Sequence, residues 1–164
     1  MPLKFHLVIP SLILTLVICS LTMAETITVG QGGGYDYTRI QNAIDAAFDG
    51  DEIKVFPGTY NERIDFLGKA IKVFSKRGNS QTTIDGQNGG SVVTFNSGEG
   101  LTSQLIGFTI TGGSGDSSIA DDTLGGGVLI VGSKPYIEKC IIKNNYADYG
   151  GGICVFESAE PYIY

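Results

Sequence analysis

The sequence predicts an all-β fold in which short strands stack turn upon turn, a parallel β-helix, with a capping α-helix at its N-terminal end. The first observation behind this prediction is a repeat in the last forty residues. The glycine triplet at 125–127 recurs 25 residues later at 150–152, and the Pro-Tyr-Ile triplet at 135–137 recurs 26 residues later at 161–163. A self-similar unit of this length is typical of a solenoid.

The second observation is that most of the chain consists of short apolar or alternating runs separated by Gly, Asn and Asp. Such runs are too short for helices and are typical of strands. Stacking one repeat on the next should place Val128 over Ile153 and should align Leu105 with Ile137 at an offset of 32 residues. The expected strands are Glu25–Val29, Glu52–Phe56, Arg63–Phe66, Ala70–Phe74, Thr82–Ile84, Val92–Phe95, Gln104–Ile110 and the runs of the two repeats.

One amphipathic helix is predicted over Tyr37–Phe48, because Tyr37, Ile40, Ile44, Ala47 and Phe48 recur at helical spacing. Asp36 is the expected N-cap and Gly50 the expected stop. An apolar core that begins with the first turn of a solenoid needs a cover at that end. We therefore expect the helix to cap the first turn rather than to bind a partner.

The first 24 residues are predicted to be a signal peptide. Lys4 and His6 precede an apolar stretch over 7–18, and small residues flank a cleavage site after Ala24. The stretch is short for a membrane span, and an uncleaved anchor is the alternative. We expect residues 25–164 to be secreted, periplasmic or displayed on the cell surface, with no transmembrane segment after cleavage.

Composition excludes several classes of function. The chain carries 17 acidic and 11 basic residues, a net charge of −6, and shows no basic cluster in the sequence, so nucleic acid is not an expected partner. The sole histidine, His6, leaves with the signal peptide, which removes histidine-based catalytic and metal sites from the remainder. Cofactor binding is not expected, because the glycine-rich stretch at 30–34 lacks the spacing of a nucleotide loop.

Two cysteines remain after residue 24, and an even number in an exported protein permits a disulfide. Cys140 aligns with Phe108 at an inward position, whereas Cys154, between Ile153 and Val155, should point the other way. We expect Cys140 to be a buried free thiol and no bridge to form.

A candidate calcium site lies in the long connection between the repeats, where Asp116, Asp121 and Asp122 stand among serines. Carboxylate oxygens on a loop suit Ca²⁺. The run Gly-Gly-Ser-Gly-Asp at 112–116 approaches a calcium-binding nonapeptide, but its aspartate comes one place early. A solvated polar loop without a metal is the alternative. The tyrosines Tyr136, Tyr146, Tyr149 and Tyr162 form a second candidate, an aromatic platform for sugars, or a simple cover for the side of the coil.

Several stretches resemble known β-helix families. Residues 27–30, 37–47, 49–53 and 57–62 resemble the opening of pectin methylesterases and other pectin-lyase-like proteins. Residues 83–86 and 106–110 are similar to turns of bacterial right-handed parallel β-helix repeat proteins. The run 140–145, with the glycines before Ile153, resembles repeats of polymorphic outer-membrane proteins. The resemblance implies a right-handed coil and an extracellular role, but it does not specify an activity, because this fold supports many functions.

The catalytic residues stay unknown. The aspartate pair, glutamines and arginine of pectin methylesterases have no counterpart here, and neither do the grouped calcium ligands of pectate lyases. The last repeat ends at Tyr164 in mid-turn, so we expect residues 25–164 to be the N-terminal part of a longer β-helix domain. A short protein closed by dimerisation is the alternative.

Two functions from different classes are left open. The first is an exported protein that binds or acts on extracellular polysaccharide through a groove on one face of the solenoid. The second is a non-catalytic cell-surface or adhesion solenoid. Whether the parent protein is a lyase, hydrolase or esterase is not decided by the sequence.

Overall fold

The computed structural model describes residues 23–118 and 121–164. The predicted signal peptide lies almost entirely outside these residues, so its cleavage stays a prediction. Within the described part of the chain, no helix has the length and apolar character needed to cross a bilayer.

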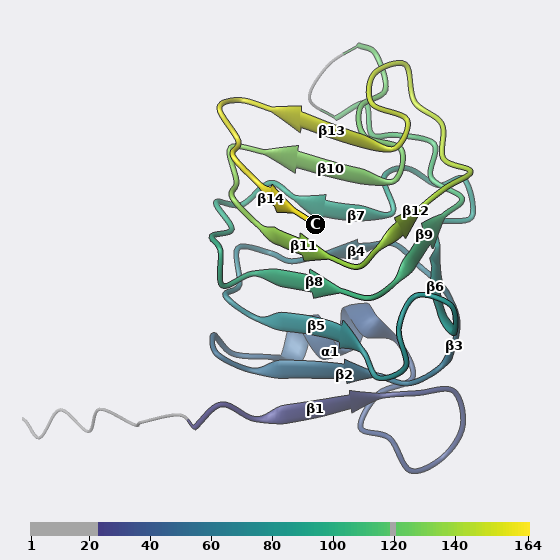
Figure 1. Ribbon diagram of the computed structural model, residues 1–164, viewed down its shortest axis with the longest axis vertical. Coiled ribbons are helices and arrows are strands. Elements are labelled where there is room, and N and C mark those ends of the chain that lie inside the picture. Colours follow the sequence, from purple (N-terminus) through teal and green to yellow (C-terminus); the bar gives the residue numbers. More distant parts are fainter. Residues whose placement is uncertain (1–22, 119–120) are drawn as a thin grey trace, which may run out of the picture.

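The described residues form a predominantly β structure of three parallel sheets and one short helix (Figure 1). The six-stranded sheet contains, in order, β1 (Thr26–Val29), β2 (Glu52–Val55), β5 (Lys72–Ser75), β8 (Gln104–Ile106), β11 (Tyr136–Glu138) and β14 (Tyr162–Ile163). The β3–β12 sheet contains β3 (Gly58–Asn61), β6 (Thr82–Asp85), β9 (Thr109–Thr111) and β12 (Ile141–Ile142). The β4–β13 sheet contains β4 (Ile64–Asp65), β7 (Val93–Phe95), β10 (Val128–Val131) and β13 (Ile153–Phe156).

From β3 onward the chain visits the three sheets in strict rotation, so each pass adds one strand to every sheet. All pairings between these strands are parallel. Val128 pairs with Ile153, Leu105 with Ile137 and Tyr136 with Tyr162. The repeat register predicted from the sequence is therefore confirmed.

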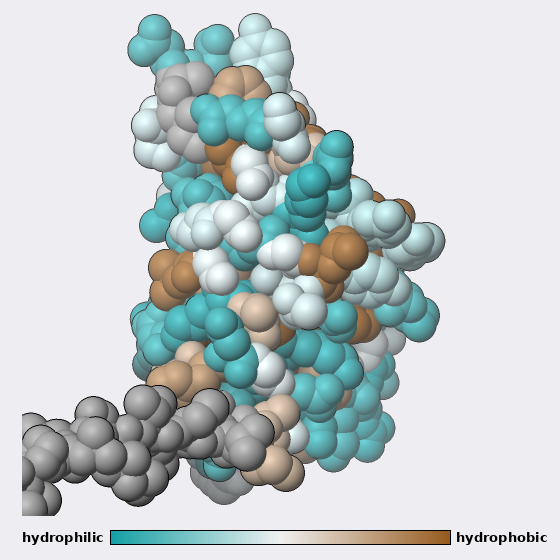
Figure 2. All heavy atoms as spheres, turned by 90° about the vertical axis from the view of Figure 1, so that its left-hand side faces the viewer, coloured by the Kyte–Doolittle hydropathy of each residue, from teal (hydrophilic) through white to brown (hydrophobic). Residues whose placement is uncertain are grey.

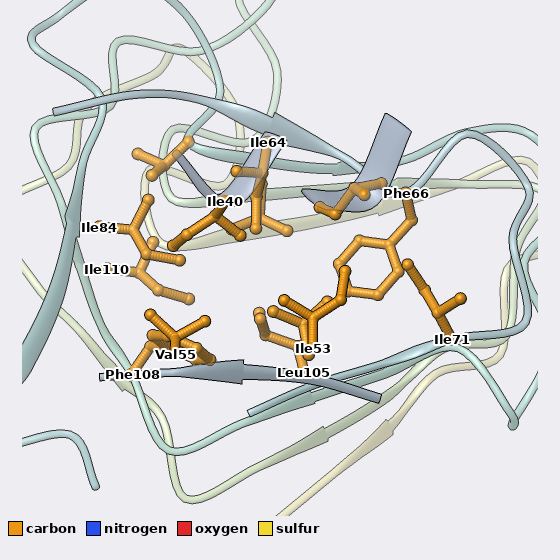
Figure 3. Packing of buried hydrophobic residues seen from close by; sticks show 14 of the residues in the cluster. Ile40, Ile53, Val55, Ile64, Phe66, Ile71, Ile84, Leu105, Phe108 and Ile110 are labelled. Atoms are coloured by element: carbon orange, nitrogen blue, oxygen red, sulfur yellow. The ribbon is translucent and has the colours of Figure 1, made fainter. Parts of the chain in front are cut away.

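One hydrophobic core lies between the three sheets, and each pass contributes to it (Figure 3). Inward positions stack on one another along the six-stranded sheet, where Ile53 pairs with Val73, Val73 with Leu105 and Leu105 with Ile137. The Phe66 and Phe95 rings pack at a centroid distance of 4.3 Å. Alternate side chains of each strand therefore face the core, and the others form the outer faces.

The helix α1 (Ile40–Ala46) is shorter than the predicted span of Tyr37–Phe48. Ile40, Ala43 and Ile44 are buried against the core, as the helical spacing predicted, but Phe48 is 70% exposed. The helix contacts β1, β2 and β4, at the N-terminal end of the sheets. Its cover of the first turns is consistent with the expected capping role.

The expected N-cap was wrong. Asp36 instead accepts hydrogen bonds from the backbone N–H and hydroxyl of Thr28 at 2.7 and 2.6 Å. The first turn of the helix is held by the buried carboxylate of Glu62, which accepts from the N–H groups of Ile40 and Gln41 at 2.8 and 3.0 Å. A carboxylate 22 residues downstream thus satisfies two of the free N–H groups at the helix start, in place of a local cap.

Two strand predictions also need correction. The expected strand Gln104–Ile110 is two strands on different sheets, because Gly107 adopts a left-handed conformation with φ of +79° and turns the chain between them. Strand β3 was missed, since Gly58 and Asn61 resemble turn residues. Tyr60 nevertheless fixes this strand, with its ring buried and its hydroxyl donating to the Phe56 carbonyl at 2.8 Å.

The two described cysteines are free thiols, and Cys140, which was expected to be buried, is half-buried like Cys154. Cys140 packs against the main core beside Phe108, and burial raises the pKa of its thiol. Cys154 packs against a small outer cluster of Leu124, Leu129 and Val131.

The connections that join the β4–β13 sheet to the six-stranded sheet carry a buried carboxylate. Glu99 accepts hydrogen bonds from the N–H groups of Gly68 and Ser97 at 2.8 and 2.9 Å and from the Ser133 hydroxyl at 2.8 Å. It ties three successive connections together. Figure 2 shows this side of the molecule, where hydrophobic residues are scattered among hydrophilic ones.

Candidate functional site

A polar cleft opens on the outer face of the β4–β13 sheet, with a volume of about 330 Å³. Its lining comes from α1, from both ends of β4, from β7 and from the long connection between β9 and β10. The lining residues are Gln41, Arg63, Ile64, Asp65, Ser91, Thr94, Asn96 and Asp116.

The alternation of β4 aims two charged side chains outward. Ile64 and Phe66 face the core and are buried, so Arg63 and Asp65 face the opposite way. Arg63 lies along the turn that precedes β7: a Cβ added to Gly90 would come within 2.5 Å of its Nη1 atom. Gly90 also has φ of +136°, so glycine serves both the turn and the space beside the guanidinium.

Asp65 is a half-buried carboxyl whose Oδ1 accepts the Leu67 N–H at 2.9 Å. Burial raises the pKa of Asp65, and the nearby carboxylates of Glu99 and Asp45 add to the effect, against the lowering by the Leu67 N–H. A carboxyl whose pKa is raised inside a cleft is a recognised mark of a functional site. Gln41 holds the backbone of Asp65 in place, since its amide oxygen accepts from the Asp65 N–H at 2.7 Å.

The long connection after β9 is anchored to the rim of this cleft. The Ser114 N–H donates to the Gly90 carbonyl at 3.0 Å, and its hydroxyl donates to the Asn88 carbonyl at 3.0 Å. Asp116 and Leu124 exchange two backbone hydrogen bonds of 2.9 and 2.8 Å, which close the loop and hold Asp116 over the cleft. The carboxylate of Asp116 accepts the Ser118 N–H at 2.7 Å.

A second hollow of about 360 Å³ continues this face toward β13, and its lining is largely apolar. Its lining residues are Asp122, Leu124, Tyr149, Cys154 and Phe156. The outward positions change along the sheet, because Asp65 and Thr94 are followed in register by Leu129 and Cys154. The face is therefore polar at its N-terminal rungs and apolar at its C-terminal rungs.

The predicted calcium ligands border two different hollows. Asp116 lines the polar cleft, Asp122 lines the apolar hollow, and both Asp121 and Asp122 are exposed. Among residues 23–118 and 121–164, no group of three or more acidic, cysteine or histidine side chains is placed to hold a metal ion. The calcium site stays a prediction, to be tested by titration.

The predicted tyrosine platform falls into two places. Tyr136 and Tyr162 stack one rung apart on the outer face of the six-stranded sheet, as the repeat predicted, and the Tyr164 ring lies 5.8 Å from Tyr136 and 6.4 Å from Tyr162. Tyr149 instead borders the apolar hollow, and Tyr146 is exposed on the neighbouring connection.

Sequence reasoning missed the polar cleft, although one signal for it was present. Arg63 and Asp65 are two charges spaced by one residue around buried Ile64, which places both on one outer face. Their partners in the cleft come from positions between 22 and 53 residues away, and short-range patterns do not report such contacts.

Comparisons of the chain with protein-family models, with curated proteins and with solved structures find no match.

Proposed function

We propose that the chain winds as a right-handed parallel β-helix capped by α1, and that it binds an extracellular polysaccharide along the outer face of the β4–β13 sheet. The rotation of the chain through three parallel sheets supports the coil, and the resemblance to pectin-lyase-like proteins supports its hand. The export of the protein rests on the predicted signal peptide.

The observation that carries the binding proposal is the polar cleft with Arg63, Asp65 and Asp116 on its walls. Carboxylates and the side chains of Thr94 and Asn96 can exchange hydrogen bonds with sugar hydroxyls. A guanidinium can bind a sugar carboxylate through two parallel N–H groups. Among the described residues no ion pair engages Arg63, so its guanidinium is available for a ligand.

The adjoining apolar hollow extends the same face and gives room for further sugar units. The ring of Tyr149 and the side chain of Phe156 supply apolar surface beside the polar cleft. Polysaccharides combine hydroxyl-rich edges with apolar ring faces, so a site with both characters suits them.

A hydrolase is the second candidate function, and one observation favours it. Burial raises the pKa of Asp65, and Asp65 shares its cleft with a second carboxyl group, that of Asp116. A protonated carboxyl and a second carboxylate across one bond are the groups that glycoside hydrolysis requires. The adhesion role left open by the sequence stays a prediction.

Binding is tested by titrating the protein with polygalacturonate and with a neutral galactan, followed by calorimetry. We expect polygalacturonate to bind, and Arg63→Ala to weaken that binding by about tenfold, because a charge-assisted contact is lost. Lys143→Ala is the matched control, since this exposed cation lies outside the cleft. If neither polymer binds, or if both variants bind like the wild type, the proposal is wrong.

The hydrolase is tested on the same polymers by the release of reducing ends. Activity should fall at least ~100-fold in Asp65→Asn and in Asp116→Asn, whereas binding should persist. Binding without any released ends would leave the binding function and reject the hydrolase.

A further inference from the structure

A patch of lysines and aromatic rings lies on the outer face of the six-stranded sheet, away from the cleft. Inward residues Ile53, Val55 and Val73 are buried, so the alternate positions of β2 and β5 face outward. We call this surface the lysine–aromatic patch; its members are Lys54, Phe56, Lys72, Phe74 and Lys76.

Lysine and aromatic side chains alternate along each strand and between the two strands. Lys54 pairs in register with Phe74, and Lys76 follows β5 beside Phe56. The Lys76 Nζ atom lies 4.3 Å from the Phe56 ring centroid, and the Nζ atoms of Lys72 and Lys54 lie 4.8 and 5.9 Å from that of Phe74. Each ammonium is therefore held over a ring at the surface instead of moving freely in solvent.

The patch is a local excess of positive charge on an acidic protein. Four of the 11 basic residues, Lys54, Lys72, Lys76 and Arg77, fall within 24 positions of one another and on or beside these two strands. Lys72 pairs with Glu52 at 2.9 Å, whereas no ion pair engages Lys54 or Lys76 among the described residues. Elsewhere, Lys69 donates to three carbonyls at the end of α1, and Lys134 and Lys139 form ion pairs with Glu160 and Glu138.

The same outer face continues to the tyrosine cluster of Tyr136, Tyr162 and Tyr164. Three strand steps separate β5 from β14 in this sheet, a distance of roughly 14 Å. Gln104 and Ile106 of β8 lie outward between the two groups, and Glu138 of β11 follows Ile106 in register with its carboxylate paired to Lys139 at 2.6 Å. One extended ligand can thus contact ammonium groups at one end and phenol rings at the other.

We infer that this face binds an anionic polysaccharide, with its carboxylates on the lysine–aromatic patch and its sugar rings on the tyrosines. The ammonium groups provide the counter-charge, and tyrosine rings offer flat apolar surface with a hydroxyl for hydrogen bonding. Single-stranded nucleic acid uses similar groups but carries a denser charge, which an overall charge of −6 disfavours. This goes beyond the proposed function, because the cleft takes no part in it.

The experiment measures binding of the full chain to four probes: polygalacturonate, heparin, neutral dextran and a single-stranded oligonucleotide. We expect polygalacturonate to bind and dextran not to bind. Raising the salt from about 20 mM to about 200 mM should weaken the polygalacturonate complex several-fold, since exposed charges are screened. If heparin binds more tightly than polygalacturonate, the groups that the lysines recognise are sulfates and not carboxylates. The inference as stated would then be wrong.

Variants separate this face from the cleft. The double variant Lys54→Gln/Lys76→Gln should lose about 5- to 20-fold in affinity for polygalacturonate, and Tyr162→Ala a further few-fold. Lys134→Gln/Lys143→Gln, with two exposed lysines outside the patch, is the matched control and should lose less than about twofold. Melting curves confirm that the variants, all at surface positions, stay folded.

Three further results would overturn the inference. One is a Lys54→Gln/Lys76→Gln variant that binds polygalacturonate like the wild type. Another is a loss of polygalacturonate binding in Arg63→Ala and in none of the patch variants, since all the binding would then take place in the cleft. The third is an oligonucleotide that binds more tightly than polygalacturonate, which would identify the partner as nucleic acid.

Discussion

The outer faces of the β4–β13 sheet and of the six-stranded sheet are built by the same alternation, yet they differ in chemistry. The first carries Arg63 and Asp65 in a cleft that the long connection deepens with Asp116. The second carries Lys54, Phe74 and neighbouring side chains on an open sheet, at or near its surface. Both faces lie over the same hydrophobic core.

The difference between the two faces arises from the long connection between β9 and β10, which lies against only one of them. Insertions in a repeat collect in the loops, and here the longest one folds back onto one face through its bonds to Gly90 and Asn88. Burial in the cleft raises the pKa of Asp65, whereas charges on the open face stay in contact with solvent and salt. The two faces should therefore respond differently to pH and to ionic strength.

The largest effect is expected from the core beneath both faces. Phe66→Ala removes a ring that packs at 4.3 Å from Phe95, and both rings are fully buried. The free energy of unfolding should fall by about 3–5 kcal/mol, measured by urea denaturation. Leu67→Ala, at the exposed neighbouring residue, is the control and should change it by less than about 0.5 kcal/mol. Equal losses in both variants would mean that the Phe66 ring is not part of a packed core.

The next effect concerns the N-terminal end of α1. It should change binding at one outer face and not at the other. Glu62→Ala leaves the Ile40 and Gln41 N–H groups without their acceptor, which should cost about 1–3 kcal/mol of unfolding free energy. Gln41 lines the cleft, so binding there should weaken, whereas binding at the lysine–aromatic patch should persist. Glu160→Ala, at an exposed carboxylate, serves as the control.

A loss of patch binding in Glu62→Ala, at a temperature where the variant is folded, would contradict this separation. It would indicate that the helix end and the six-stranded sheet respond as one unit.

The sequence predicted the repeat register because similar side chains recur at corresponding positions of successive repeats, where they stack on one another. Val128 over Ile153 and Tyr136 over Tyr162 follow from spacing alone. Inward positions obey a packing requirement that leaves a periodic mark, and the capping helix left the same mark at Ile40 and Ile44.

What the sequence did not predict depends on contacts between distant segments or on single backbone angles. The cap from Glu62 comes 22 residues after the helix start, and the break at Gly107 depends on one left-handed residue inside an apolar run. Outward residues have no packing requirement, so neither the cleft around Asp65 nor the pairing of Lys54 with Phe74 had a periodic signal. Parallel pairing brought them together across gaps of 20 to 50 residues.

A smaller effect should appear in the pH dependence of stability at the cleft. Burial raises the pKa of Asp65 above its ordinary 3.8, so the folded state holds this proton more tightly than the unfolded chain does. The resulting stabilisation is present at low pH and is lost as the pH rises from about 3.8 through the raised folded pKa. Relative to Asp65→Asn, the wild type should therefore be more stable at pH ~3 than at pH ~7.

The matched control for Asp65 is Asp148, because its shift has the opposite sign. Hydrogen bonds from the Thr123 N–H and hydroxyl lower the pKa of Asp148, so its contribution is present above the ordinary pKa and is lost as the pH falls. Urea denaturation of both asparagine variants between about pH 3 and pH 7 checks the two signs together. Parallel trends in the two variants would contradict the burial of Asp65.

The smallest effect tests the inside–outside alternation on which both faces depend. Cys140 faces the core, where burial raises the pKa of its thiol and lowers its thiolate fraction, whereas Cys154 packs on the outer side with Leu129. Iodoacetamide should modify Cys154 of the folded protein roughly tenfold faster than Cys140, followed by mass spectrometry of the peptides. In urea the two rates should converge, which controls for intrinsic reactivity. Equal rates in the folded protein would place both thiols on one side, and the assignment of outward residues on β13 would then fail.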